Sequence, residues 1–160
     1  SPSEQGLYRD GEAAVRWARE HLGGRLVLLG ESLGGGVAVE MAARHHPAAL
    51  ILESAAASLV DIARDAYPWL PAGLLMRDRF EAERRMPEVT CPLLAMHGEE
   101  DRVIPLALGR RLYEAARCPK TWWPVPRAGH GELLETLGPE YLRRLTAFLA
   151  GLPPAAEPGD

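Results

Sequence analysis

Four short strand-like runs alternate with helix-forming segments along this chain, and this alternation limits the folds open to it. The predicted strands are Leu26–Leu29, Ala49–Leu52, Leu93–Met96 and Lys120–Val125. Short, continuously apolar runs are typical of strands covered on both faces, as in a parallel sheet. Strands that alternate with helices favour an open sheet with helices on both faces. We therefore expect an α/β fold with a parallel sheet of about four strands and flanking helices.

Apolar residues at helical spacing predict the segments between these strands. Helices are expected at residues 7–22, 37–46, 61–67, 73–79, 107–116 and 141–149. The first should begin near Ser1 as the cap, with Pro2 in the first turn and Glu4 three residues after the cap. We expect one partial domain over residues 1–152, with a short helical cap insertion at about 59–89, and a flexible tail at 153–160.

The composition excludes several classes of protein. With 160 residues, 47% of them hydrophobic, the chain fits a single globular core. The 18 basic and 22 acidic residues give a net charge of -4, which argues against nucleic acid as a partner. Two cysteines are too few for a disulfide scaffold. No apolar run reaches the roughly 18 residues of a membrane span and no signal peptide is visible, so a cytoplasmic location is the default expectation.

The first strand runs directly into a G-x-S-x-G motif, Gly30-Glu31-Ser32-Leu33-Gly34, followed by a helix. In such a turn the serine backbone is strained and the hydroxyl projects into the open. We expect glycine to be required at 30 and 34, because a side chain there would collide across the turn. Two alternatives are a serine that merely caps the helix and a phosphate-binding loop. The latter lacks a Walker-type lysine and an evident ribose-binding acid.

A serine hydroxyl is a poor nucleophile unless a base accepts its proton. Of the five histidines, His21, His45 and His46 lie near helix ends, where histidine is usually a surface residue. His97 follows the third strand and fits a structural role in that turn. His130 has a glycine on each side, in the loop after the fourth strand, so its ring is free to approach a neighbour. His130 is therefore the predicted base.

The base in turn needs a carboxylate that holds its tautomer. Three carboxylates follow the third strand, on Glu99, Glu100 and Asp101. Asp101 is preferred because the next residues, Val103-Ile104-Pro105, lead the chain back to a helix. Glu99 and Glu100 remain alternatives that we expect to face water.

With these motifs in the order Ser32, Asp101, His130, the chain resembles the C-terminal half of an α/β-hydrolase. It is most similar to the Bem46-like serine hydrolases, which include the ABHD13- and ABHD17-type acyl hydrolases. One departure is Gly131-Glu132, where this family often has Asn-Asp. The matching segments are SPSEQGLYRDGEAAVRWA, LLGESLGGGVAVEMAA, AYPWLPAGLLMRDRFEAERRMPEVTCPLLAMHGEEDRVIP and AGHGELL.

The resemblance implies a serine hydrolase acting on carboxylic ester or thioester substrates, with no metal and no organic cofactor. It implies Ser32 as nucleophile, Asp101 as acid and His130 as base, with the N–H of Leu33 as one oxyanion donor. In this fold a second donor comes from a loop after an earlier strand, and no segment of this chain matches that loop.

The resemblance also implies further strands before the first helix. Without them the strand at 26–29 becomes a bare apolar edge. We expect either a missing N-terminal half or self-association along that edge. In the cap, Trp69 and Leu70 are the residues expected to contact substrate. Two other functions stay open: a non-catalytic hydrolase remnant that serves as a binding or assembly module, and an acyltransferase or haloperoxidase-like activity in the same site.

Overall fold

The computed structural model describes residues 3–154, so Ser1, Pro2 and residues 155–160 of the predicted tail lie outside the described residues. The strands are β1 (Val27–Glu31), β2 (Ala49–Glu53), β3 (Leu93–Gly98) and β4 (Lys120–Val125). The helices are α1 (Glu4–His21), α2 (Leu33–His45), α3 (Leu59–Ala66), α4 (Ala72–Leu75), α5 (Ala82–Arg85), α6 (Leu106–Ala115), α7 (Leu133–Leu137) and α8 (Pro139–Ala150), with the 3₁₀ turn η1 at Met86–Glu88.

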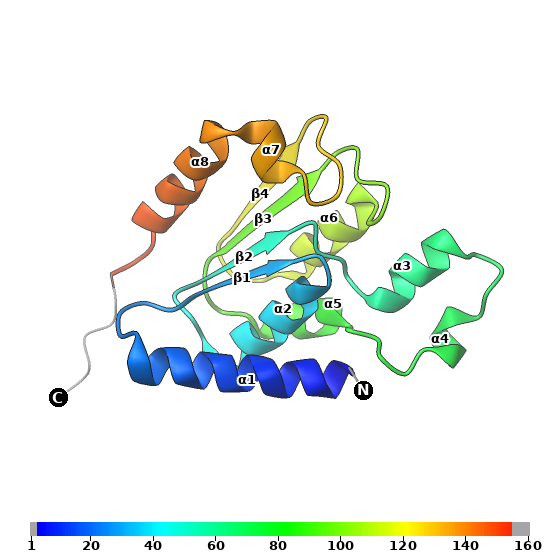
Figure 1. The fold of residues 1–160 in the computed structure, drawn as a ribbon, viewed down its shortest axis with the longest axis horizontal. Coiled ribbons are helices and arrows are strands. Elements are labelled where there is room, and N and C mark those ends of the chain that lie inside the picture. Colours follow the sequence, from blue (N-terminus) through cyan, green and yellow to red (C-terminus); the bar gives the residue numbers. More distant parts are fainter. Residues whose placement is uncertain (1–2, 155–160) are drawn as a thin grey trace.

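The four strands form one parallel sheet in the order β1-β2-β3-β4, as expected from the sequence (Figure 1). Right-handed crossovers between strands that are also neighbours in sequence place every connecting helix on the same face of a sheet. The helices α2, α5 and α6 do share one face, where Val39, Ala82 and Leu112 pack with Leu50 and Leu93. This cluster is the main core.

The opposite face of the sheet is covered by α7 and α8, which follow the last strand. Tyr141 and Phe148 of α8 pack against a cluster that includes Ile51 and Leu94. This cover reaches β1 only at Val27, which is half-buried, and Leu29 on the same face is 52% exposed. The expectation that strand 26–29 is covered on both faces is therefore wrong for this side. The physical reason is that β1 is the edge strand and all three crossovers lie on the other face.

The helix α1 packs on α2, with Tyr8 and Val15 buried against Met41. Its N-cap is Ser3, whose hydroxyl accepts the N–H of Gly6 at 3.1 Å. The cap predicted at Ser1 lies outside the described residues. One Glu4 oxygen accepts the backbone N–H of Arg79 at 2.7 Å and the other accepts the Tyr8 hydroxyl at 2.8 Å.

The helices α3 and α4 project beyond the carboxyl end of the sheet and form a small cap (Figure 1). This cap is shorter than the 59–89 expected from the sequence, because Ala82, Met86 and Val89 are buried in the main core. The helix predicted at 73–79 ends at Leu75. Met76 is extended, and the chain then turns so that Asp78 accepts the N–H of Glu4.

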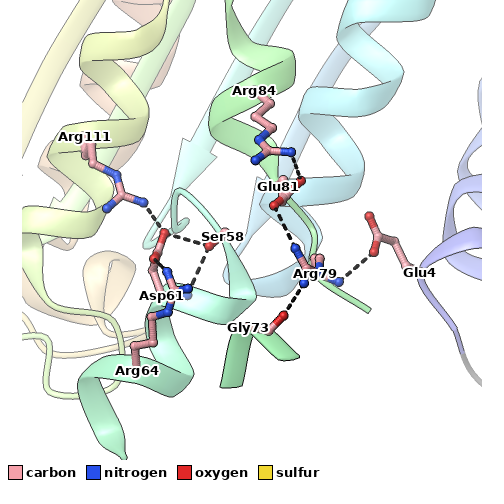
Figure 2. Close-up of polar contacts among 9 residues, drawn as sticks. All are labelled: Glu4, Ser58, Asp61, Arg64, Gly73, Arg79, Glu81, Arg84 and Arg111. Atoms are coloured by element: carbon pink, nitrogen blue, oxygen red, sulfur yellow. Dashed lines mark hydrogen bonds and ion pairs between the residues drawn. The ribbon is translucent and has the colours of Figure 1, made fainter. Parts of the chain in front are cut away.

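Ion pairs connect the cap to the body (Figure 2). Asp61 of α3 pairs with Arg111 of α6. On the segment that joins α4 to α5, Glu81 pairs with Arg84 at 2.8 Å and with Arg79 at 3.6 Å. Since Arg79 also bonds to Gly73 of the cap, the network ties α3 and α4 to α5 and α6. Among residues 3–154, none of the helices has the length and apolar character needed to cross a bilayer.

Candidate active site

The turn between β1 and α2 holds Ser32 in a strained backbone conformation, with φ 51° and ψ -121°. Its N–H donates to the carbonyl of Glu53 at 2.9 Å, which ties the turn to the neighbouring strand. The Ser32 side chain makes no capping hydrogen bond to α2. The alternative that this serine only caps the helix is therefore wrong.

The glycines of this turn differ in what they permit. A Cβ on Gly30 would lie 2.6 Å from the Cβ of Ala38, so only glycine fits there. A Cβ on Gly34 would meet no atom within 4 Å, and the collision expected from the sequence at this position is therefore wrong. The close approach falls one residue later, since a Cβ on Gly35 would lie 2.4 Å from the Cβ of Ala55. Gly35 lets α2 lie directly against the chain that leaves β2.

The loop after β4 brings His130 to the turn that carries Ser32. The distance from His130 Nε2 to Ser32 Oγ is 3.0 Å, and His130 Nδ1 is 2.8 Å from Asp101 Oδ2. A neutral ring that donates from Nδ1 to the carboxylate leaves Nε2 free to accept the serine proton. The three side chains predicted from the sequence thus meet at the carboxyl ends of β1, β3 and β4. Open parallel sheets bind their ligands at this edge.

Burial and hydrogen bonds distinguish Asp101 from its acidic neighbours. Asp101 is 7% exposed, and its Oδ1 accepts the backbone N–H groups of Val103 at 2.9 Å and Ile104 at 2.8 Å. These bonds fix the carboxylate while Oδ2 faces His130. Glu99 and Glu100 are exposed, as expected. The structure therefore brings one of the three candidate acids to the histidine.

An apolar cavity of about 200 Å³ opens beside Ser32. Its wall comes from the start of α2, from both ends of the cap and from the loop after Asp101. The lining residues are Ser32, Leu33, Gly36, Ala56, Ser58, Leu59, Ile62, Phe80, Val103 and Ile104. Leu33 is the first residue of α2, where helix N–H groups lack a partner within the helix.

Trp69 and Leu70, predicted as substrate contacts, do not line this cavity, and Trp69 is 78% exposed. A role for these two residues in substrate binding stays a prediction. Ile62 and Phe80 do line the cavity, although the sequence did not single them out. An i, i+3 spacing of Leu59 and Ile62 in α3 is the local signal that could have indicated an apolar face. No local signal points to Phe80, which reaches the cavity from the end of the cap.

A second acidic group lies near the site, at the end of β2. Glu53 is 9% exposed and accepts a hydrogen bond from the Tyr141 hydroxyl. Burial raises the pKa of Glu53, and the neighbouring Glu31 carboxylate raises it further, against the opposing effect of Tyr141. Among residues 3–154, no group of three or more His, Cys, Asp or Glu side chains is placed to hold a metal ion.

Comparisons of sequence and fold show which known proteins this chain is related to. No protein-family model matches the chain. An uncharacterized protein of Mycobacterium tuberculosis is 40% identical over 134 residues, covering 82% of this chain and 48% of that protein. The human alpha/beta hydrolase domain-containing protein 17C is 36% identical over 154 residues, covering 93% of this chain and 44% of that protein. The chain thus spans about half the length of the curated relatives it matches.

This chain belongs to the α/β-hydrolase superfamily. Solved structures agree on the fold. An esterase of Pyrococcus furiosus superimposes with a TM-score of 0.73 at 16% identity, covering 91% of this chain and 62% of that structure. A structure from a study of the lipolytic enzymes LipS and LipT superimposes with a TM-score of 0.71 at 24% identity. The match covers 93% of this α/β-hydrolase and 74% of the chain in that structure. The resemblance expected from the sequence is confirmed.

Proposed function

We propose that this α/β-hydrolase is a serine hydrolase that cleaves carboxylic esters or thioesters through an acyl-enzyme. The observation that carries the proposal is that His130 contacts both Ser32 Oγ and Asp101 at hydrogen-bond distance. A nucleophile, a base and an orienting acid within hydrogen-bond distance are the arrangement that activates a serine. The positive φ of Ser32 supports the same role, because strain of this kind is typical of a nucleophile turn.

In the proposed reaction, Ser32 Oγ attacks the acyl carbonyl carbon while His130 Nε2 takes the hydroxyl proton. Asp101 stabilises the imidazolium that forms. The N–H of Leu33, the residue after the nucleophile, donates to the developing oxyanion. The intermediate then collapses to the acyl-enzyme, and His130 returns the proton to the departing alcohol or thiol. Water, activated by His130, attacks the acyl-enzyme and releases the carboxylic acid and free Ser32.

The cavity beside Ser32 suggests where the acyl group lies. Its wall is mainly aliphatic and aromatic, with Ile62, Phe80 and Val103 as the larger side chains. At about 200 Å³ it is smaller than the roughly 300–1,000 Å³ of sites for drug-sized ligands. We therefore propose a short acyl chain as the group held there. The names of similar folds, which include esterases and lipases, support ester hydrolysis.

Reaction of the full-length protein with a fluorophosphonate probe tests this proposal, followed by peptide mapping and by turnover of short-chain esters. We expect labelling at Ser32 and loss of both labelling and turnover in Ser32→Ala. Ser58→Ala is the matched control, because Ser58 lines the same cavity but donates its hydroxyl to Asp61. Absence of label at Ser32, or unchanged turnover in Ser32→Ala, would instead favour a binding module.

A further inference from the structure

A second histidine lies beneath the candidate triad and belongs to none of the steps above. His97, on β3, is 1% exposed. Its Nε2 is 2.8 Å from the carbonyl oxygen of Ile104 and 3.4 Å from Asp101 Oδ2. Both neighbours of Nε2 are acceptors, so the proton of a neutral ring resides on this nitrogen. His97 is therefore a donor aimed at the carbonyl of Ile104 and at the triad carboxylate.

The ring of His97 is fixed from two sides. On α6, a Cβ on Gly109 would lie 2.2 Å from His97 Nδ1, so glycine lets the helix pack directly on the ring. On β4, Trp122 stacks with the imidazole at 6.2 Å between ring centroids and 28° between planes. Burial lowers the pKa of His97 below its ordinary value, against the opposing effects of Ile104 and Asp101. The ring thus stays a neutral donor at pH 7 with a single orientation.

The hydrogen bond from His97 holds Ile104, a residue that contacts both the triad acid and the cavity. Ile104 gives its N–H to Asp101 Oδ1 and receives the His97 hydrogen bond on its carbonyl, so the residue is held at both ends of its backbone. Ile104 also lines the apolar cavity beside Ser32. One imidazole therefore contacts both the triad carboxylate and the wall of the acyl site.

We propose that His97 is a positioning residue that sets the orientation of Asp101 and the place of Ile104 in the cavity wall. This inference rests on the proposed function. Without the donor, the buried carbonyl of Ile104 loses its partner, and an unpaired buried acceptor favours rearrangement of the loop. A shift of about 1 Å in a catalytic group can lower turnover by roughly 100-fold. We expect His97→Leu to lower kcat by about that factor.

His97→Gln is the conservative variant, because a glutamine amide can place an N–H near the position of Nε2. We expect kcat of His97→Gln to be at least about tenfold higher than kcat of His97→Leu, because glutamine restores the hydrogen-bond donor. His97→Leu should also change KM more for esters whose acyl chain fills the cavity than for acetyl esters. The reason is that Ile104, which lines the cavity, moves. A purely structural histidine predicts neither the rescue nor the dependence of KM on chain length.

The experiment compares the full-length wild type, His97→Leu and His97→Gln by steady-state kinetics on acetyl and longer acyl esters. It also records the low-field proton NMR signal of the His130–Asp101 hydrogen bond, which needs no turnover. His21→Gln is the control, because His21 is exposed and its ring bonds to the carbonyl of Trp17 in its own helix. The signal should be present in wild type, His97→Gln and His21→Gln and absent or displaced in His97→Leu.

Gly109→Ala provides a second route if His97→Leu does not fold. It keeps His97 but pushes its ring, and alanine is a better helix former than glycine. Unchanged kcat and an unchanged low-field signal in His97→Leu or Gly109→Ala overturn the positioning role while the hydrolase proposal stands. If wild type neither reacts with fluorophosphonate nor hydrolyses esters, the proposed function fails. The response of the NMR signal to His97→Leu then still decides whether His97 orients Asp101.

Discussion

The hydroxyl oxygen of Ser32 lies 3.0 Å from Nε2 of His130, although 98 residues separate them in the chain. The first follows the edge strand β1 and the second follows β4 at the other edge of the sheet. The contact therefore exists only when all four strands pair in parallel, because a parallel sheet places the carboxyl ends of all its strands on the same side. Any change that shifts this register is expected to separate the two side chains.

Asp101→Asn tests the orienting role of the acid. The amide keeps an oxygen that can accept from Val103 and Ile104, but an amide group that donates toward His130 favours the wrong ring tautomer. We expect kcat for ester hydrolysis to fall by roughly 1,000- to 10,000-fold with the fold retained. Glu100→Gln, on an exposed neighbour, is the control and should behave as wild type. A loss of less than tenfold in Asp101→Asn would contradict the assignment.

Ile62→Trp tests the cavity as the acyl site. The larger ring should fill space beside Ser32 without touching the three polar side chains. We expect kcat/KM for butanoyl esters to fall by at least about tenfold, while acetyl esters change little, because each methylene excluded from an apolar site has this order of effect. The measurement is kcat/KM over a series of acyl lengths.

The matched control for the cavity is Leu74→Trp, at a cap residue that is 88% exposed and does not line the cavity. It should leave the chain-length profile unchanged. If Leu74→Trp changes the profile and Ile62→Trp does not, the acyl chain lies against the outer cap, where Trp69 and Leu70 were first expected to bind it.

Glu53→Gln tests the buried carboxyl group beside the site. The folded-state pKa of Glu53 is raised, chiefly by burial. Its contribution to stability is then fully present below the unfolded pKa of about 4.3 and is lost as pH rises through the raised folded value. Glutamine has no charge to bury and can still accept from Tyr141. We expect Glu53→Gln to melt at a higher temperature than wild type at pH 8, with the gap closing toward pH 4.

Calorimetry or circular dichroism from pH 4 to pH 8 measures this difference. Glu99→Gln removes an exposed charge and serves as the control, so its melting curve should follow that of wild type at each pH. A Glu53→Gln variant less stable than wild type at pH 8 would show that the ionised carboxylate is net stabilising in the fold.

Asp61→Asn tests the ion pairs that hold the cap. Burial raises the pKa of Asp61, but hydrogen bonds from Ser58 and Arg111 outweigh this effect and lower the pKa below its ordinary value. A lowered folded-state pKa contributes stability that is present above the unfolded pKa of about 3.9 and is lost as pH falls through the folded value. We expect Asp61→Asn to be less stable at pH 7 and to lose less stability on acidification.

Acid unfolding between pH 7 and pH 2 gives the comparison for Asp61→Asn. The matched variant is Asp65→Asn, on the exposed side of the same helix. It should follow the wild-type curve, whereas Asp61→Asn converges with wild type at the acid end. Equal stability of Asp61→Asn and wild type at pH 7 would mean that the pair with Arg111 does not hold the cap.

Several features follow from the sequence by local rules. The strand–turn–helix at Gly30–Gly34 is encoded in neighbouring residues, since an apolar run, a glycine and a helical pattern each act over a few positions. Alternating strands and helices indicate a parallel sheet, and its carboxyl edge indicates where Ser32, Asp101 and His130 lie. These predictions need no knowledge of which side chains meet.

The tertiary structure decides the rest, because packing joins residues that the sequence keeps apart. Three acids follow β3, yet only Asp101 is buried with two backbone N–H groups on one oxygen. The apolar wall of the cavity comes from four separate segments of the chain and does not include Trp69. Leu29 is open because every crossover helix lies on the other face of the sheet. Local pattern determined which elements form, and long-range packing determined which side chains share one environment.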